Sequence, residues 1–211
     1  MDIPTEYCET LTGYVLSQPL NAISNVAFLI AAWFAYKCLQ DRGAKRLYVL
    51  PILLAFVGIS SAWWHITDSH LGDILDTFSI VVFASVAVII LLTRISKSKP
   101  AIALSFVALL SLVFTTERST ALNGSLPYVV LLVGLAIAGS IYIRKFPEAK
   151  VWLYSSLVTF FVAIVVRSTD IFLCPSIPFG THFLWHILVA ALGYQLIRLL
   201  GFNGVNHHLK S

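Results

Sequence analysis

Seven apolar stretches occupy most of this chain, and each is long enough to cross the roughly 30 Å hydrocarbon core of a membrane as a helix. They cover residues 21–39, 48–66, 74–93, 100–116, 126–143, 151–173 and 181–200. The composition agrees with this pattern, because 58% of the 211 residues are hydrophobic and only 11% are charged. We therefore expect an all-α, polytopic membrane protein with seven transmembrane helices in a single domain, residues 1–211.

The basic residues predict the orientation of these spans, because Lys and Arg accumulate in cytoplasmic loops. Twelve of the fourteen lie at or after the ends of the odd-numbered spans: Lys37, Arg42, Lys45, Arg46, Arg94, Lys97, Lys99, Arg144, Lys145, Lys150, Arg198 and Lys210. Only Arg118 and Arg167 fall on the other side. The N-terminus is thus expected outside or in a lumen and the C-terminus in the cytoplasm.

This topology also explains the net charge of +4, so nucleic-acid binding is not expected. The chain is predicted to be a multi-pass protein of a bacterial inner or plasma membrane, or of a eukaryotic endomembrane. Its partners are then the membrane and its lipids, while the sequence leaves the oligomeric state open.

Polar residues interrupt the apolar pattern at residues 60–76. His65 ends the second span, and Asp76 lies at the start of the third. An acid at the centre of a membrane helix costs about 2.5–3.5 kcal/mol on insertion scales, so such a residue is a functional candidate. For Asp76 taken alone, a buried pair that joins two helices is an equally good explanation.

A second polar group surrounds the start of the first span. Asn21, Ser24 and Asn25 stand at i, i+3 and i+4 and therefore share one helix face, where hydrogen bonds to neighbouring helices are a better explanation than direct ligand contact. Glu6 and Glu9 precede them. These two acids could bind a hard cation such as calcium, or they could form a solvated terminus.

The three cysteines fall on different sides of the predicted membrane. Cys8 and Cys174 both lie on the outer side, and we predict a disulfide between them if that side is oxidising. Cys38 lies at the cytoplasmic end of the first span, where it is expected to be a free, small and buried hydrophobic residue. Near the outer end of the sixth span, Arg167 and Asp170 stand at i and i+3 and are expected to form a structural pair.

Two more histidines begin the seventh span. His182 and His186 stand at i and i+4, the spacing used by helical zinc sites, although such a pair alone is a weak signal. Together with His65 and Asp76 they lie at one depth in the outer part of the bilayer. Three neutral imidazoles suit Zn²⁺ and leave the fourth tetrahedral position for water, the open arrangement of a catalytic site.

The residues of this proposed metal site resemble those of a known group of proteins. Ser61-x3-His65, Asp76 and His182-x3-His186 look like the metal signature of the superfamily that contains alkaline ceramidases and adiponectin-receptor-like proteins. Further matches favour the ceramidase branch: Cys8-Glu9 ahead of Asn21-x2-Ser24-Asn25, and Arg167-x2-Asp170-x3-Cys174. The resemblance covers nearly the whole chain. It implies seven helices, a zinc held by the three histidines, and hydrolysis of the ceramide amide to sphingosine and a fatty acid.

The resemblance also implies a calcium site built from N-terminal oxygens, and here the chain departs from the pattern. Glu6 and Glu9 stand at corresponding places, but Leu11 replaces an amide side chain and Gln18 replaces an acid. The sequence therefore supports zinc and leaves the calcium site incomplete.

The expected mechanism assigns roles to two further residues. Asp76 takes the proton of the water activated by zinc as this water attacks the amide carbonyl, and passes the proton to the leaving amine. Ser61 lies one helical turn before His65 and donates to the oxyanion that develops on the former carbonyl oxygen. The lipid substrate reaches this site from the bilayer.

Two other functions use the same histidines. A non-enzymatic receptor or metal-binding membrane protein, of the adiponectin-receptor-like type, needs the same three ligands. Haem held by two histidines of the second and seventh spans is another arrangement, but it leaves Asp76 and Ser61 unexplained.

Overall fold

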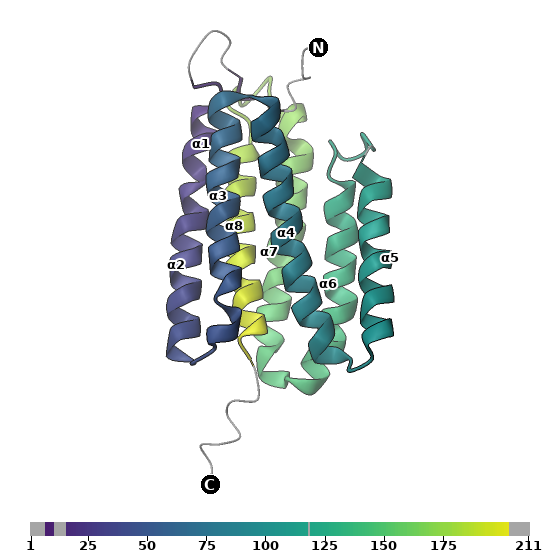
Figure 1. Ribbon diagram of the computed structural model, residues 1–211. Coiled ribbons are helices and arrows are strands. Elements are labelled where there is room, and N and C mark those ends of the chain that lie inside the picture. The colour runs from purple at the N-terminus through teal and green to yellow at the C-terminus, as the bar shows by residue number, and fades with distance from the viewer. Residues whose placement is uncertain (1–6, 11–15, 118, 203–211) are drawn as a thin grey trace.

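The computed structural model describes residues 7–10, 16–117 and 119–202, and this part of the chain is helical and contains no β-strand. Eight α-helices run along a common bundle axis (Figure 1). In chain order they are α1 Pro19–Ser24, α2 Val26–Asp41, α3 Val49–Thr67, α4 His70–Ile95, α5 Lys99–Glu117, α6 Leu126–Lys145, α7 Lys150–Leu173 and α8 His182–Leu200. Short 3-10 helices, η1 Lys45–Leu47 and η2 Pro147–Ala149, precede α3 and α7.

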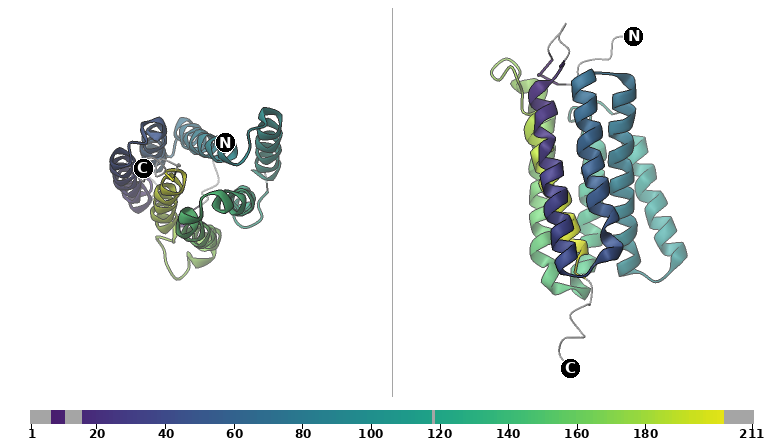
Figure 2. Two further views of the ribbon diagram at one scale, coloured as in Figure 1. Left: turned by 90° about the horizontal axis from the view of Figure 1, so that it is seen from below. Right: turned by 60° about the vertical axis from the view of Figure 1, so that its left-hand side comes forward.

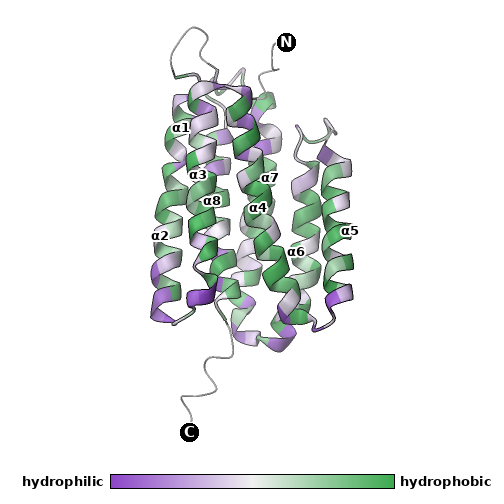
Figure 3. Cartoon of the chain, in the orientation of Figure 1, coloured by the Kyte–Doolittle hydropathy of each residue, from purple (hydrophilic) through white to green (hydrophobic). Residues whose placement is uncertain are grey.

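The seven predicted spans are confirmed by length and composition. Within the described residues, seven helical segments are long and apolar enough to cross a membrane, with α1 and α2 forming one of them, Pro19–Asp41. The third span begins at His70 rather than at residue 74, because Ser69 caps it: the Ser69 Oγ accepts a hydrogen bond from the Gly72 amide at 3.2 Å. Figure 3 shows hydrophobic residues along the middle of the helices and hydrophilic residues gathered near their ends, as a membrane protein requires.

The turn between α3 and α4 determines where the site residues meet. Asp68 adopts a left-handed conformation with φ of 47° and ends α3, and α4 begins two residues later. Gly72 then permits a close approach of the two helices, since a Cβ atom at this position would lie 2.9 Å from the Trp64 Cα. The last turns of α3 therefore run beside the first turns of α4.

Helix α8 has many helix neighbours in the bundle. It packs against α7, α2, α1, α3 and α4, and the view along the bundle axis shows it between α2 and α7 (Figure 2, left). Apolar residues along its length, such as Ala190, Ile197 and Leu199, are almost fully buried. Helix α5 is the opposite case: none of its described residues is buried, and it packs mainly on α6.

Candidate metal centre

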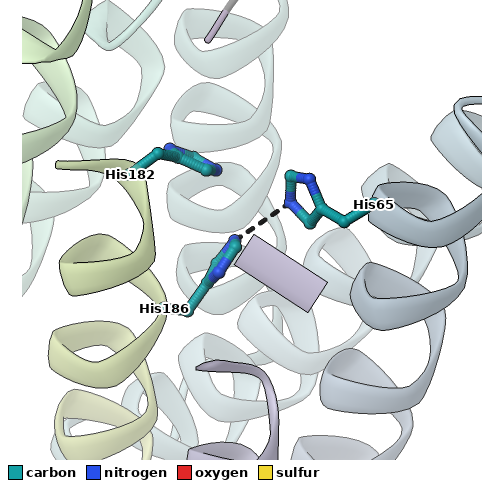
Figure 4. A group of neighbouring side chains, drawn as sticks. All are labelled: His65, His182 and His186. Carbon is teal, nitrogen blue, oxygen red and sulfur yellow. Dashed lines mark hydrogen bonds between the residues drawn. The ribbon is translucent and has the colours of Figure 1, made fainter. Parts of the chain in front are cut away.

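Three histidines from two helices meet near one end of the bundle. His65 lies in the last turns of α3, and His182 and His186 lie in the first turns of α8. All three are at least 97% buried, and each offers a ligand atom within 4.8 Å of the others. Figure 4 shows the rings converging from α3 and α8, with a dashed contact of 3.1 Å between the Nε2 atoms of His65 and His186.

The partner of His65 determines which of its nitrogens carries a proton. The Gln18 Oε1 lies 2.7 Å from the His65 Nδ1 and also accepts a hydrogen bond from the Asn21 Nδ2 at 2.9 Å. A carbonyl oxygen can only accept, so the His65 Nδ1 must be the donor. A neutral His65 therefore presents a lone pair at Nε2.

His186 is oriented in the same way by a hydroxyl group. The Ser24 Oγ donates to the Asn21 carbonyl at 2.7 Å and lies 2.8 Å from the His186 Nδ1. Because the single hydroxyl proton already goes to the carbonyl, Ser24 accepts from the Nδ1 of His186. A neutral His186 thus also presents its lone pair at Nε2.

These two assignments direct two lone pairs at each other across 3.1 Å. Such an arrangement is repulsive unless a cation lies between the nitrogens. Zinc–nitrogen bonds of about 2.0–2.1 Å in a tetrahedron separate two ligand nitrogens by about 3.3–3.4 Å, close to the distance found here. The residues therefore fit a zinc ion.

His182 completes the cluster. Its ring stacks on Tyr7 with the ring centroids 3.7 Å apart. Its Nδ1 is buried and has no hydrogen-bond partner among the described residues, so this nitrogen is available to a ligand or an ion. Its amide donates to the Asp170 Oδ1 at 3.0 Å, a contact that fixes the first residue of α8.

Ser61 and Asp76 lie beside the histidines. The Ser61 hydroxyl lies near the Asp76 carboxylate, and the Asp76 Oδ1 is buried without a hydrogen-bond partner in the described ranges. Both residues line one cavity together with His182 and His186. The structure thus places an acid and a hydroxyl in the lining of the cavity that two of the candidate metal ligands also line.

This cavity has a volume of about 380 Å³ and is lined mainly by residues of α3 to α8. Its polar lining is concentrated at the histidine end, and most of the remaining lining is apolar. Asp76 and Ile95 both line it, and the rise of a helix separates them by about 28 Å along α4. Ile137 and Ile141 of α6 line it as well and are 62% and 42% exposed. The cavity therefore extends from the histidines through most of the bundle and reaches its side.

The Cys8–Cys174 disulfide is confirmed, with the two Cα atoms 5.2 Å apart. It ties the segment before α1 to the end of α7. Cys38 is free, as predicted, but it is only partly buried.

Arg167 and Asp170 do not share the partners expected from their spacing. Arg167 donates from Nη1 to the Asn123 carbonyl and to the Ser125 Oγ. Asp170 instead accepts from backbone amides, at 2.9 Å from Cys8 and 3.0 Å from His182. In the described residues the two side chains thus hold different segments. The predicted contact between Arg167 and Asp170 is therefore wrong, although each residue has a structural role.

The residues expected to bind calcium have other contacts where they are described. Glu6 lies outside the described residues. The two carboxylate oxygens of Glu9 accept from the amides of Leu20 and Asn21 at 2.8 and 2.7 Å, so this acid holds the first turn of α1. Calcium binding therefore stays a prediction. Asn25, which was expected to bond to a neighbouring helix, donates instead to the Asn21 carbonyl at 2.8 Å.

Sequence reasoning missed the groups that orient the histidines. Gln18 was noted only as a departure from an acidic pattern, and Tyr7 was not singled out. Ser24 was expected to join helices; it does so, and its partner is a site histidine. The shared helix face of Asn21, Ser24 and Asn25 was the sequence signal that pointed to these contacts.

A family model described as Ceramidase matches residues 4–210, which is nearly the whole chain. No curated protein matches the chain.

Proposed function

The chain belongs to the ceramidase family, and from this premise we propose that it is a zinc-dependent amidase that cleaves ceramide-like N-acyl lipids to a sphingoid base and a free fatty acid. The observation that carries the proposal is the pair of opposed Nε2 atoms of His65 and His186, whose other nitrogens are held by Gln18 and Ser24. This arrangement suits a bound cation within the membrane-spanning part of the protein.

His65, His182 and His186 would hold the ion. When bound, zinc supplies Lewis-acid activation of water and of a carbonyl oxygen. Gln18 and Ser24 keep the two imidazoles in the tautomer that a metal ligand needs, a role that such outer partners commonly have.

Asp76 is proposed to move the proton. Its buried Oδ1 lacks a donor in the described part of the chain and faces the same cavity end as His182 and His186. A carboxylate in this place can accept a proton from the attacking water and return it to the nitrogen of the leaving amine. The amine then departs neutral and the fatty acid remains as the second product.

Ser61 is proposed to stabilise the oxygen that becomes negative during attack. Its hydroxyl lines the cavity one helical turn before His65 and has one proton to donate. In the resting site this hydroxyl neighbours Asp76, and with substrate bound it can turn toward the former carbonyl oxygen.

The substrate is proposed to come from the bilayer. The cavity offers polar groups at one end and a long apolar lining beyond them, which suits an amide with long hydrocarbon chains. The exposed faces of Ile137 and Ile141 place part of its lining at the lipid-facing surface.

We propose that the histidine end of the bundle faces the extracytoplasmic or lumenal side. The Cys8–Cys174 disulfide lies at this end, and disulfides persist in oxidising compartments. The basic residues that end α6 and begin α7 gather at the opposite end, as expected for cytoplasmic loops.

Purified protein incubated with ceramides of defined acyl length tests the proposal through the release of free amine and fatty acid in equal amounts. The control is a variant of His70, an exposed histidine outside the cluster, which should keep full activity as His70→Ala. Protein that binds zinc but cleaves no N-acyl lipid would favour the receptor or metal-binding function instead.

A further inference from the structure

A groove between α2 and α8 lies at the end of the bundle opposite the histidines. It has a volume of about 370 Å³ and is lined by Phe34, Lys37, Cys38, Asp41, Arg42, Tyr194 and Arg198. Three of these side chains are cations and one is an acid. None of them belongs to the proposed catalytic site, and α2 and α8 pack along each other here (Figure 2, right).

The sequence spacing makes this groove amphipathic. Phe34, Lys37 and Asp41 stand at i, i+3 and i+7 and share one face of α2, while Tyr194 and Arg198 stand at i and i+4 on α8. Phe34 lies one turn nearer the middle of the bundle than Lys37 and is 58% exposed. An apolar surface therefore continues directly from the cationic end of the groove toward the membrane interior.

Aromatic rings hold the two guanidinium groups. The Arg42 Cζ lies 4.3 Å from the centroid of the Phe202 ring, and the Arg198 Cζ lies 4.4 Å from that of Trp152. The Arg198 Nη1 donates to the Tyr194 Oη at 2.9 Å. Such contacts fix the position of a guanidinium without neutralising its charge. Both arginines thus have defined contacts while they keep positive charge for an anion.

We propose that this groove binds one anionic phospholipid, with its phosphate held by Arg42 and Arg198 and an acyl chain lying along Phe34. Guanidinium groups match the geometry of phosphate oxygens, and basic pockets between helices at the cytoplasmic end of a membrane protein recognise anionic headgroups. In the orientation proposed above, this end meets the cytoplasmic leaflet, where anionic lipids are found.

A different explanation is that these residues only contribute diffuse charge, as basic residues at the cytoplasmic ends of membrane helices generally do. The chain offers a matched control for this explanation. Lys45 and Arg46 are exposed, lie at the same end of the bundle and do not line the groove. Replacing them removes the same number of charges as replacing Arg42 and Arg198.

Native mass spectrometry of the full chain, purified with mixed phosphatidylglycerol and phosphatidylcholine, tests the site. The wild type should retain one phosphatidylglycerol in preference to phosphatidylcholine. The Arg42→Gln/Arg198→Gln variant should bind phosphatidylglycerol at least about tenfold more weakly than the wild type. The Lys45→Gln/Arg46→Gln variant should bind it as the wild type does. The single variant Lys37→Gln, at an exposed position, should show a smaller loss.

Three results would overturn the proposal. The first is equal retention of the two lipids by the wild type. The second is equal weakening in both double variants, which would indicate diffuse charge alone. The third is displacement of the bound lipid by millimolar glycerol phosphate, which would indicate that a soluble phosphate is the ligand and that the acyl chain contributes nothing. Circular dichroism of each variant shows whether the helices are retained.

Discussion

The two walls of the large cavity differ in how firmly their side chains are held. On the wall formed by α3 and α8, both His65 and His186 have a hydrogen-bonded partner at Nδ1, and all three histidines are buried. On the opposite side, α5 has no buried residue in its described range, and the only buried residues of α6 are Gly139 and Tyr142.

This difference separates two tasks. Catalytic groups must keep their orientation to within small tolerances, so they belong on helices that are locked by packing and hydrogen bonds. A lipid chain needs only an apolar surface and room to enter, which a loosely packed outer pair of helices provides. Substitutions on the first wall should therefore change rate or metal affinity, and those on the second should change substrate preference.

The largest effect is expected for Asp76→Asn. Removing the proton acceptor should lower the rate of amide hydrolysis by about 10²–10⁴-fold while zinc content stays at the wild-type level. Single-turnover kinetics measure the chemical step. Glu148→Gln, at an exposed acid in η2 at the opposite end of the bundle, is the control and should retain the wild-type rate. Undiminished cleavage by Asp76→Asn would exclude its role as the base.

Ser61→Ala should have the next largest effect. Loss of a donor to a developing oxyanion usually lowers kcat by about 10²–10³-fold. The neighbouring Ser60 is a matched control, because its hydroxyl donates to the Ser79 Oγ at 2.7 Å and does not line the cavity. Steady-state kinetics that show equal losses in Ser61→Ala and Ser60→Ala would indicate a packing effect rather than a catalytic one.

Gln18→Leu tests whether the first wall is held by the outer partners of the histidines. The variant leaves the His65 Nδ1 without its acceptor, and zinc affinity should fall by about 10–100-fold. Competition with a chelator measures this affinity. Gln195→Leu removes a side-chain contact between α8 and α7 away from the cluster, and its zinc affinity should not change. Unaltered affinity in Gln18→Leu would show that the amide does not position His65.

The smallest effect is expected on the second wall, from Ala138→Phe. Ala138 lines the cavity about 18 Å along α6 from Leu126, so a larger side chain there should obstruct long acyl chains before short ones. The ratio of kcat/KM for short against long N-acyl substrates should rise about tenfold. Ala103→Phe, at an exposed position of α5, should leave the ratio unchanged.

Much of the fold could be predicted because membrane spans leave a local signal. Hydropathy and length identified all seven, and the Ser69 cap accounts for the extra turn at the start of α4. The proximity of the three histidines followed from their depth at helix ends. The disulfide followed from the predicted topology, which placed Cys8 and Cys174 on one side.

The contacts around the site could not be predicted in the same way, because they join residues far apart in the chain without any periodic pattern. Gln18 meets His65 across 47 positions, and Ser24 meets His186 across 162. The expected pair of Arg167 and Asp170 shows that a suitable spacing does not ensure a contact. Their i, i+3 spacing permits a contact, but backbone amides before α1 and at the start of α8 approach Asp170 instead.

The zinc content of the purified protein tests the proposed metal centre most directly. We predict about one zinc per chain in the wild type and in His70→Ala, and a loss of most of this zinc in His186→Ala. Elemental analysis after gel filtration in metal-free buffer provides the measurement, with circular dichroism to show that the helices are retained. A full zinc complement in His186→Ala, or a wild type that takes up no zinc when zinc is supplied, would contradict the assignment of the three histidines.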